Sequence, residues 1–343
     1  MPTRRDMQAA VVAMLLGGWA GPAAAADLDR GPTGGQDTHA TVPSADWSPG
    51  WFAGDAGDDW LLGNPLRLTP RPRATAVHRY PQGPPLEGDF PGRRLLLSFD
   101  DGPKPATTTR LLDILRREHV HAAFFVSAWR LATLPDCAAA RRLVVRMAAD
   151  GHAVGSHGYE HPHMNRMSDA KRLRQLVRAH QALLPLLGYA PTLFRPPYGL
   201  TTPELDRLLA FHGYTRVHWS YVGGEFNGRA APYRVRTILR QMREREAEGR
   251  YPGGIVLLHD THARTVDAVE LLIRRLRAEN CALLDAGDDD LWRFVEVSEL
   301  LDPAGSPPGT GSVPAPPAVL AEARTWCAAH AAELPELYLL DGT

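Results

Sequence analysis

Residues 94–103 read Arg-Leu-Leu-Leu-Ser-Phe-Asp-Asp-Gly-Pro, a short apolar run closed by two carboxylates and a turn sequence. Such a run predicts a buried strand over residues 94–99 that ends in a tight loop. Asp100 and Asp101 then stand at the carboxyl end of this strand. Because ligands of α/β folds bind at the carboxyl ends of parallel strands, the two carboxylates are candidates for chemistry.

Strand-like and helical segments alternate along the chain beyond this first strand. Such alternation implies parallel pairing and an α/β architecture, and its repetition is compatible with a barrel. Further strands are expected at 122–126, 153–155, a short segment ending at 194, 215–220, 255–258 and 294–297. The expected helices are 105–120, 138–150, 168–187, 203–211, 233–248, 266–279 and 318–340.

The first residues have the layout of a secretory signal. Arg4 and Arg5 precede a mostly apolar run over residues 7–20 that is too short to span a bilayer, and residues 23–26 offer an A-x-A-type cleavage site. Residues 3–7 also resemble the start of a twin-arginine signal. We therefore expect an exported protein, either periplasmic or secreted.

Composition divides the chain into four parts. We expect a signal peptide at 1–26, a Pro/Gly-rich N-terminal extension at 27–90, one α/β domain at 91–302, and a Pro-rich linker with a C-terminal helix at 303–343. Cys137, Cys281 and Cys327 lack metal-type spacing. One pair is able to form in an oxidising compartment, for example Cys281 with Cys327, but the sequence does not choose the pairing.

Charge and hydropathy exclude several classes of protein. Lys+Arg 38 against Asp+Glu 39 gives a formal net charge of -1, which argues against a nucleic-acid binder and against a polybasic membrane-surface protein. No stretch other than the signal approaches the length of a transmembrane helix. We expect a monomer without a transmembrane segment after signal removal.

Polar residues also follow other expected strands. Each cluster alone has an ordinary interpretation as a turn or a solvated surface, but their common place at strand ends is what points to a site. They are His157 and His161, Arg195 and Tyr198, and His259 with Asp260.

Together these residue types describe metal-assisted hydrolysis. A catalytic zinc takes three protein ligands, such as two histidines and a carboxylate, and keeps one position open for water. The histidine pair and one of the two aspartates supply that set, and the metal lowers the pKa of the water to about 7. The other aspartate is placed to accept a proton, His259 to protonate a leaving group, and Arg195 to hold the base ionised.

At this point the residues resemble a known family. The chain from about residue 95 to 302 resembles the polysaccharide deacetylases of the NodB-homology type, carbohydrate esterase family four. The resemblance lies in Ser98-Phe99-Asp100-Asp101-Gly102-Pro103, the His157/His161 pair, Phe194-Arg195-Pro196-Pro197-Tyr198-Gly199 and Leu257-Leu258-His259-Asp260. It implies a distorted (β/α) barrel with an incomplete strand count and a divalent metal, usually zinc.

The resemblance also implies a role for each residue. Asp101, His157 and His161 would be the metal ligands, Asp100 the base and His259 the acid. The backbone N–H of Tyr198 would stabilise the oxyanion, and Arg195 would support Asp100. The substrate would be an acetylated polysaccharide such as chitin, peptidoglycan or a related glycan.

Two positions depart from the family pattern. Gly158 stands where the family usually has Ser or Thr after the first histidine. In the fourth motif, Val222 replaces a first acid, and Glu225 and Phe226 occupy the Asp-Trp positions. The resemblance implies that an acid of this motif partners Arg195. The sequence does not tell whether Glu225 takes that place; if it does not reach Arg195, the tuning of Asp100 is altered, and either the activity is in question or the substrate differs.

Three functions are weighed on these residues. The first is a metal-dependent N-deacetylase of a polysaccharide, the second an O-acetyl esterase of the same fold, in which the leaving alcohol needs less help from an acid. The third is a glycan-binding protein that has lost turnover, which the altered fourth motif motivates.

Overall fold

The computed structural model describes residues 85–225, 229–301 and 313–341. These residues belong to the second of two units into which the chain divides, Leu68–Thr343. The expected signal and most of the N-terminal extension therefore lie outside the described residues, as does Phe226. Within the described ranges, no helix combines the length and apolarity needed to cross a membrane.

The strands form one curled sheet in the order β1-β8-β2-β3-β4-β5-β6, with β7 also paired to β8 and β9 to β2. All pairs are parallel except β1 with β8. The strands are β1 (Asp89–Phe90), β2 (Arg94–Asp100), β3 (Ala122–Val126), β4 (Ala153–Ser156), β5 (Leu193–Phe194), β6 (Thr215–Arg216), β7 (Tyr221–Val222), β8 (Gly253–His259) and β9 (Arg293–Phe294).

A single parallel bridge joins the two ends of this sheet. Leu86, just before β1, pairs with Val217, just after β6. Its amide donates to the Arg216 carbonyl at 2.9 Å, and its carbonyl accepts from the His218 amide at 2.8 Å. The curled sheet with its short strands is the distorted barrel that the sequence predicts, because curling a sheet until its edges meet is what makes a barrel.

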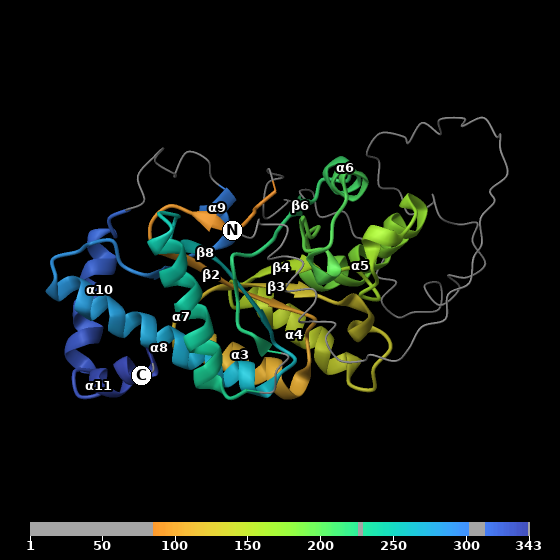
Figure 1. Cartoon of the computed structure of the whole chain (residues 1–343). Coiled ribbons are helices and arrows are strands. Elements are labelled where there is room, and N and C mark those ends of the chain that lie inside the picture. Colours follow the sequence, from red (N-terminus) through yellow and green to blue (C-terminus); the bar gives the residue numbers. More distant parts are fainter. Residues whose placement is uncertain (1–84, 226–228, 302–312, 342–343) are drawn as a thin grey trace, which may run out of the picture. The chain divides into compact units, whose positions relative to one another are not determined.

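Helices surround the outer face of the sheet (Figure 1). They touch in the order α7, α8, α3, α4, α5, α6, which follows the strand order and is the outer ring of a (β/α) architecture. The helices are α3 (Pro105–Arg117), α4 (Cys137–Ala149), α5 (Asp169–Leu187), α6 (Pro203–Phe211), α7 (Ala231–Ala247), α8 (Ala263–Asp285), α9 (Val297–Leu301), α10 (Pro317–Ala329) and α11 (Leu334–Tyr338).

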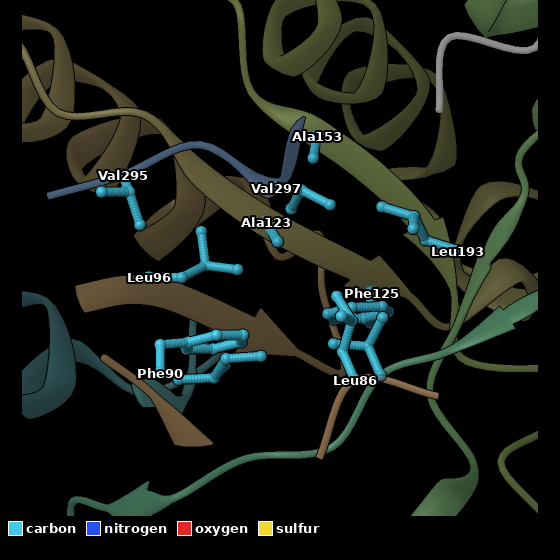
Figure 2. Packing of buried hydrophobic residues seen from close by; sticks show 11 residues of the cluster. Leu86, Phe90, Leu96, Ala123, Phe125, Ala153, Leu193, Val295 and Val297 are labelled. Carbon is cyan, nitrogen blue, oxygen red and sulfur yellow. The ribbon is translucent and has the colours of Figure 1, made fainter. Parts of the chain in front are cut away.

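Apolar side chains fill the inside of the curled sheet (Figure 2). Leu96 of β2, Phe125 of β3 and Leu193 of β5 belong to this cluster, and Leu86 and Val217 of the closing bridge complete it. Each of these side chains is less than one tenth exposed. Inward-facing side chains of neighbouring strands pack together in this way in small barrels, so the interior is a core and not a channel.

Two sequence predictions are wrong at the C-terminal side. The strand expected at 294–297 ends at Phe294, and helix α9 begins at Val297. The amide of Glu296 donates to the Glu299 side chain at 3.1 Å, as in a capping box, and this contact starts a helix where apolar alternation predicts a strand.

The helix expected at 318–340 is two helices, α10 and α11. Pro335 lacks an N–H group for a helical hydrogen bond and its ring would clash with the carbonyl four residues back, so it stands in the first turn of α11. A disulfide joins Cys281 of α8 to Cys327 of α10, with 5.7 Å between their Cα atoms. Cys137 is a free thiol.

Candidate active site

Two neighbouring strands bring the carboxylate pair and the candidate acid together. Asp100 of β2 and His259 of β8 are register partners at the carboxyl ends of their strands. Asp101 follows with a φ of 73°, a left-handed conformation that turns its side chain away from the strand direction. The Arg130 side chain donates to the Asp101 carbonyl and holds this turn in place.

Asp101, His157 and His161 form a group of ligand atoms that lie within 4.8 Å of one another. Asp101 Oδ1 is 3.2 Å from His161 Nε2 and 3.6 Å from His157 Nε2. His157 Nδ1 lies 2.7 Å from the Arg195 carbonyl, which only accepts, so Nδ1 carries the proton and Nε2 keeps its lone pair. Two imidazoles and one carboxylate with free lone pairs fit a catalytic zinc.

Burial prepares these ligands for a cation. Burial lowers the pKa of His161 to about 4, an effect to which the neighbouring His157 adds, so the imidazole is neutral at pH 7. For Asp101, burial acts to raise the pKa, but the surrounding histidines outweigh it and lower the pKa below its ordinary value. The site therefore presents neutral imidazole and ionised carboxylate, the protonation states that metal binding requires.

Arg195 is the hydrogen-bond and charge partner of Asp100. The arginine side chain is fully buried, and its Nη1 donates to Asp100 Oδ1 at 2.7 Å and to Ser98 Oγ at 2.9 Å. Its other nitrogens donate to the Val217 and His218 carbonyls. A buried guanidinium that makes four hydrogen bonds fixes the orientation of Asp100 and keeps it paired. This is the contact that the sequence predicts for Arg195.

Glu225 partners His259, which answers the question that the fourth motif leaves open. His259 Nδ1 donates to Glu225 Oε2, and the His259 amide donates to Glu225 Oε1 at 3.1 Å. Thr265 of α8 also donates to Glu225 Oε1. The carbonyls of Val217 and His218, in the segment after β6, accept from Arg195, whereas β7 runs beside β8 and places the loop at 223–225 next to His259.

Glu225 sets the state of His259. Burial alone would lower the pKa of His259, but the charge and hydrogen bond of Glu225 outweigh it and raise the pKa to about 9. The Nε2 atom of His259 faces the site, 3.9 Å from Asp101 Oδ2. A protonated imidazole with Nε2–H directed into the site is suited to donate a proton.

Tyr198 lies between two histidines that follow β4. Its backbone has a φ of 62°, a left-handed conformation inside the short turn η4 (Pro197–Gly199). His163 stacks on the Tyr198 ring with 4.0 Å between centroids, and His161 meets it edge-on at 4.5 Å. The turn carrying Tyr198 therefore packs against His161, one of the three candidate ligands. His163 carries no motif in the sequence, and sequence reasoning missed its contact with Tyr198.

Asp260 joins the end of β8 to the loop that carries Asp101. Thr108 Oγ1 donates to Asp260 Oδ2 at 2.5 Å and accepts from the Lys104 amide at 2.9 Å. A Cβ atom at Gly102 would overlap the Asp260 carboxyl group, so only glycine allows this approach.

The structure also explains why position 158 is a glycine. Its φ of 78° lies in the left-handed region that side chains disfavour, and its carbonyl accepts from the Ala128 amide at 3.2 Å. The glycine therefore suits this turn between the two histidines without the hydroxyl that the family usually carries. The ligand atoms of His157 and His161 converge regardless.

Comparison with known proteins agrees with this geometry. A family model described as Polysaccharide deacetylase matches residues 87–217. A chitooligosaccharide deacetylase of Bradyrhizobium is 34% identical over 175 residues, which cover 50% of this chain and 74% of that protein. A peptidoglycan-N-acetylglucosamine deacetylase of Listeria monocytogenes is 29% identical over 208 residues, covering 61% of this chain but only 39% of the relative.

A solved structure supports the fold independently of the sequence matches. The Bc1960 peptidoglycan N-acetylglucosamine deacetylase superposes with a TM-score of 0.51 at 26% identity, covering 58% of this chain and 88% of that one.

Proposed function

The chain belongs to the polysaccharide deacetylase family, and from that premise we propose that it is a metal-dependent hydrolase that removes N-acetyl groups from a polysaccharide. Peptidoglycan, a chitin-like polymer and an exopolysaccharide are the candidate substrates. The observation that carries the proposal is the convergence of three pairs at one end of the sheet: Asp101 with the histidine ligands, Asp100 with Arg195, and His259 with Glu225.

Each pair has a separate task in this proposal. Asp101, His157 and His161 hold a divalent cation, most simply Zn²⁺, which when bound supplies Lewis acidity and lowers the pKa of water. Asp100, oriented by the Arg195 hydrogen bond, takes the proton of the attacking water. The Tyr198 amide stabilises the negative charge that develops on the acetyl oxygen.

The His259–Glu225 pair favours an amide substrate over an ester. An amine is a poor leaving group unless it is protonated, whereas an alkoxide needs less help. Glu225 raises the pKa of His259 to about 9 and so keeps the acid charged at neutral pH. O-acetyl hydrolysis is the alternative. A glycan-binding protein without turnover would not need the acid held in this state.

We also propose that the protein works outside the cytoplasm. The signal-like residues 1–26 support this, and so does the disulfide between Cys281 and Cys327, because disulfides persist in oxidising compartments. Fractionation of cells that express the full chain tests it. Chain found only in the cytoplasm with both thiols reduced would contradict the proposal.

Acetate release from N-acetylated chitooligomers, peptidoglycan and acetylxylan tests the activity. The full chain should release acetate from an N-acetylated glycan, and Asp100→Asn should lose at least about 10²-fold in rate. Asp113→Asn is the matched control, because Asp113 is an exposed carboxylate on α3. A rate unchanged by Asp100→Asn would contradict the assigned base, and faster release from acetylxylan that His259→Ala barely slows would favour the esterase.

A further inference from the structure

A cavity of about 280 Å³ lies between the sheet and the C-terminal helices, away from the active site. Residues of β9, α8 and α10 line it, together with the turn before β3. Strand β9 pairs with Arg94 and Leu95 at the amino end of β2, whereas Asp100 stands at the carboxyl end. Six residues of strand separate the two ends, about 20 Å at the usual rise per residue.

The cavity is built around a fixed tryptophan. The Asn280 side chain donates to the Trp292 carbonyl at 2.9 Å and accepts from the Trp292 amide at 2.8 Å. Trp292 is only 5% exposed. Within the part of the chain that the structure describes, its indole Nε1 and the Nε of Arg293 are buried donors without a hydrogen-bond partner. Buried donors of this kind are normally satisfied, so two in one cavity indicate a missing acceptor.

A second tryptophan, Trp326, also lines the cavity. Trp326 of α10 is half-buried and stacks on His330 with 4.3 Å between ring centroids. The next residue, Cys327, is bonded to Cys281 of α8. The disulfide therefore ties α10 to the body of the domain, so the cavity is pre-formed and its walls need little ordering when a ligand binds.

The charge of the lining argues for a neutral ligand. Arg277 and Arg293 stand against Glu299 and Glu322, so the formal charges cancel. Arg277 is already paired, since it donates to the Glu118 carboxylate at 2.6 Å and to the Glu118 carbonyl at 2.7 Å. The partly exposed ring of Trp326, two buried N–H donors on lining residues that lack an acceptor, and balanced charge match a hexopyranose, which has apolar C–H faces and acceptor hydroxyls.

We propose that this cavity is a second glycan-binding site, one that takes a neutral sugar unit of the polymer at a distance from the active site. It goes beyond the proposed function, because it holds the polymer without taking part in acetate release. A chain bound there keeps the enzyme on an insoluble substrate and raises the local concentration of acetyl groups at the active site.

Indole ¹H–¹⁵N signals of the full chain test the proposal directly. Chitotetraose is titrated into the Asp100→Asn variant, which blocks turnover, and the Trp292 signal is assigned from its loss in Trp292→Phe. We expect a saturable shift of the Trp292 signal. Trp326→Ala should weaken the apparent affinity by about tenfold. Arg324→Ala is the matched control, since this exposed α10 residue is outside the lining.

The outcomes separate this site from the active site. If Trp292 of the Asp100→Asn variant shifts while the wild-type chain releases no acetate from any N-acetylated glycan, the second site is supported and the proposed function is contradicted. Chitotetraose that shifts other indole signals but leaves Trp292 unmoved would overturn the second site. Equal affinity in Trp326→Ala and Arg324→Ala would overturn it too. Glu322→Ala changes an exposed residue of the cavity lining. Its affinity for chitotetraose can therefore be compared with that of Trp326→Ala with little risk to folding.

Discussion

The contact between Glu225 and His259 gives the sharpest prediction. In Glu225→Gln the side chain keeps its size but loses the charge that raises the pKa of His259 to about 9. With a pKa of about 9, about 99% of the imidazole is protonated at pH 7, whereas with the ordinary value near 6.5 only about a quarter is. Loss of the Glu225 charge alone therefore lowers the protonated fraction of His259 at pH 7 by about fourfold.

Loss of the fixed orientation of His259 should account for the larger part of the fall in rate. Glu225 Oε2 accepts from the His259 ring, and Oε1 accepts from the His259 amide and from Thr265. A glutamine has only one oxygen in place of these two, so it leaves at least one of the three donors without its acceptor. Positioned acids contribute about 10²–10⁴-fold, and we expect kcat to fall by roughly 10²-fold. Because the acid works when protonated, the rate falls as the pH rises through its pKa. The alkaline limb of the pH profile should therefore move to lower pH.

Steady-state acetate release from an N-acetylated chitooligomer between pH 6 and 10 measures both effects. Glu225→Asp is the matched control, since it keeps the charge on a shorter side chain and should retain the alkaline limb near its wild-type position. A Glu225→Gln enzyme with kcat within threefold of wild type and an unmoved alkaline limb would refute the assignment of this pair.

Three further predictions concern stability. Arg195→Gln leaves the buried Asp100 carboxylate without its cation and should lower the free energy of unfolding by about 3–5 kcal/mol; urea unfolding measures this, and a loss below 1 kcal/mol would contradict the buried pair. The disulfide spans a sequence separation of 46, so the double variant Cys281→Ser/Cys327→Ser should lose up to about 4 kcal/mol. Equal stability of the native chain with and without reductant would count against this. For Asp260, burial raises the pKa to about 7, with Asp101 adding to it and the Thr108 hydrogen bond opposing it. Since the folded pKa lies above the unfolded one, stability is lost as the pH rises from about 4 to 7, by roughly 4 kcal/mol. Asp260→Asn should remove this part of the pH dependence of unfolding, and an identical dependence in both proteins would show that Asp260 is not the group.

Much of the fold was predictable because its signals are local. The strand at 122–126 and the helix at 203–211 have the bounds that the apolar pattern predicts. Parallel strands place their carboxyl ends at one edge of a sheet, so the approach of Asp101, His157 and His161 also followed from order along the chain. These predictions need only short-range periodicity and one topological rule.

The partner of Glu225 was not predictable in this way. It depends on β7, a strand of two residues that has no periodic signal of its own, and on its pairing of Val222 with Leu257 of β8. That pairing brings Glu225 to His259, 34 residues further along the chain. The stack of His163 on Tyr198 likewise depends on two loops meeting in space, which no sequence pattern records.

Metal content and acetate release measured on the same sample test the central claim most directly. The full chain is stripped with a chelator and titrated with Zn²⁺ while acetate release from an N-acetylated glycan is followed. We predict that activity returns in proportion to bound zinc and reaches its plateau at one ion per chain. In His161→Ala, both binding and activity should be lost. A folded chain that binds one zinc through these residues and releases no acetate from any N-acetylated glycan, or one that is fully active without metal, would contradict the claim.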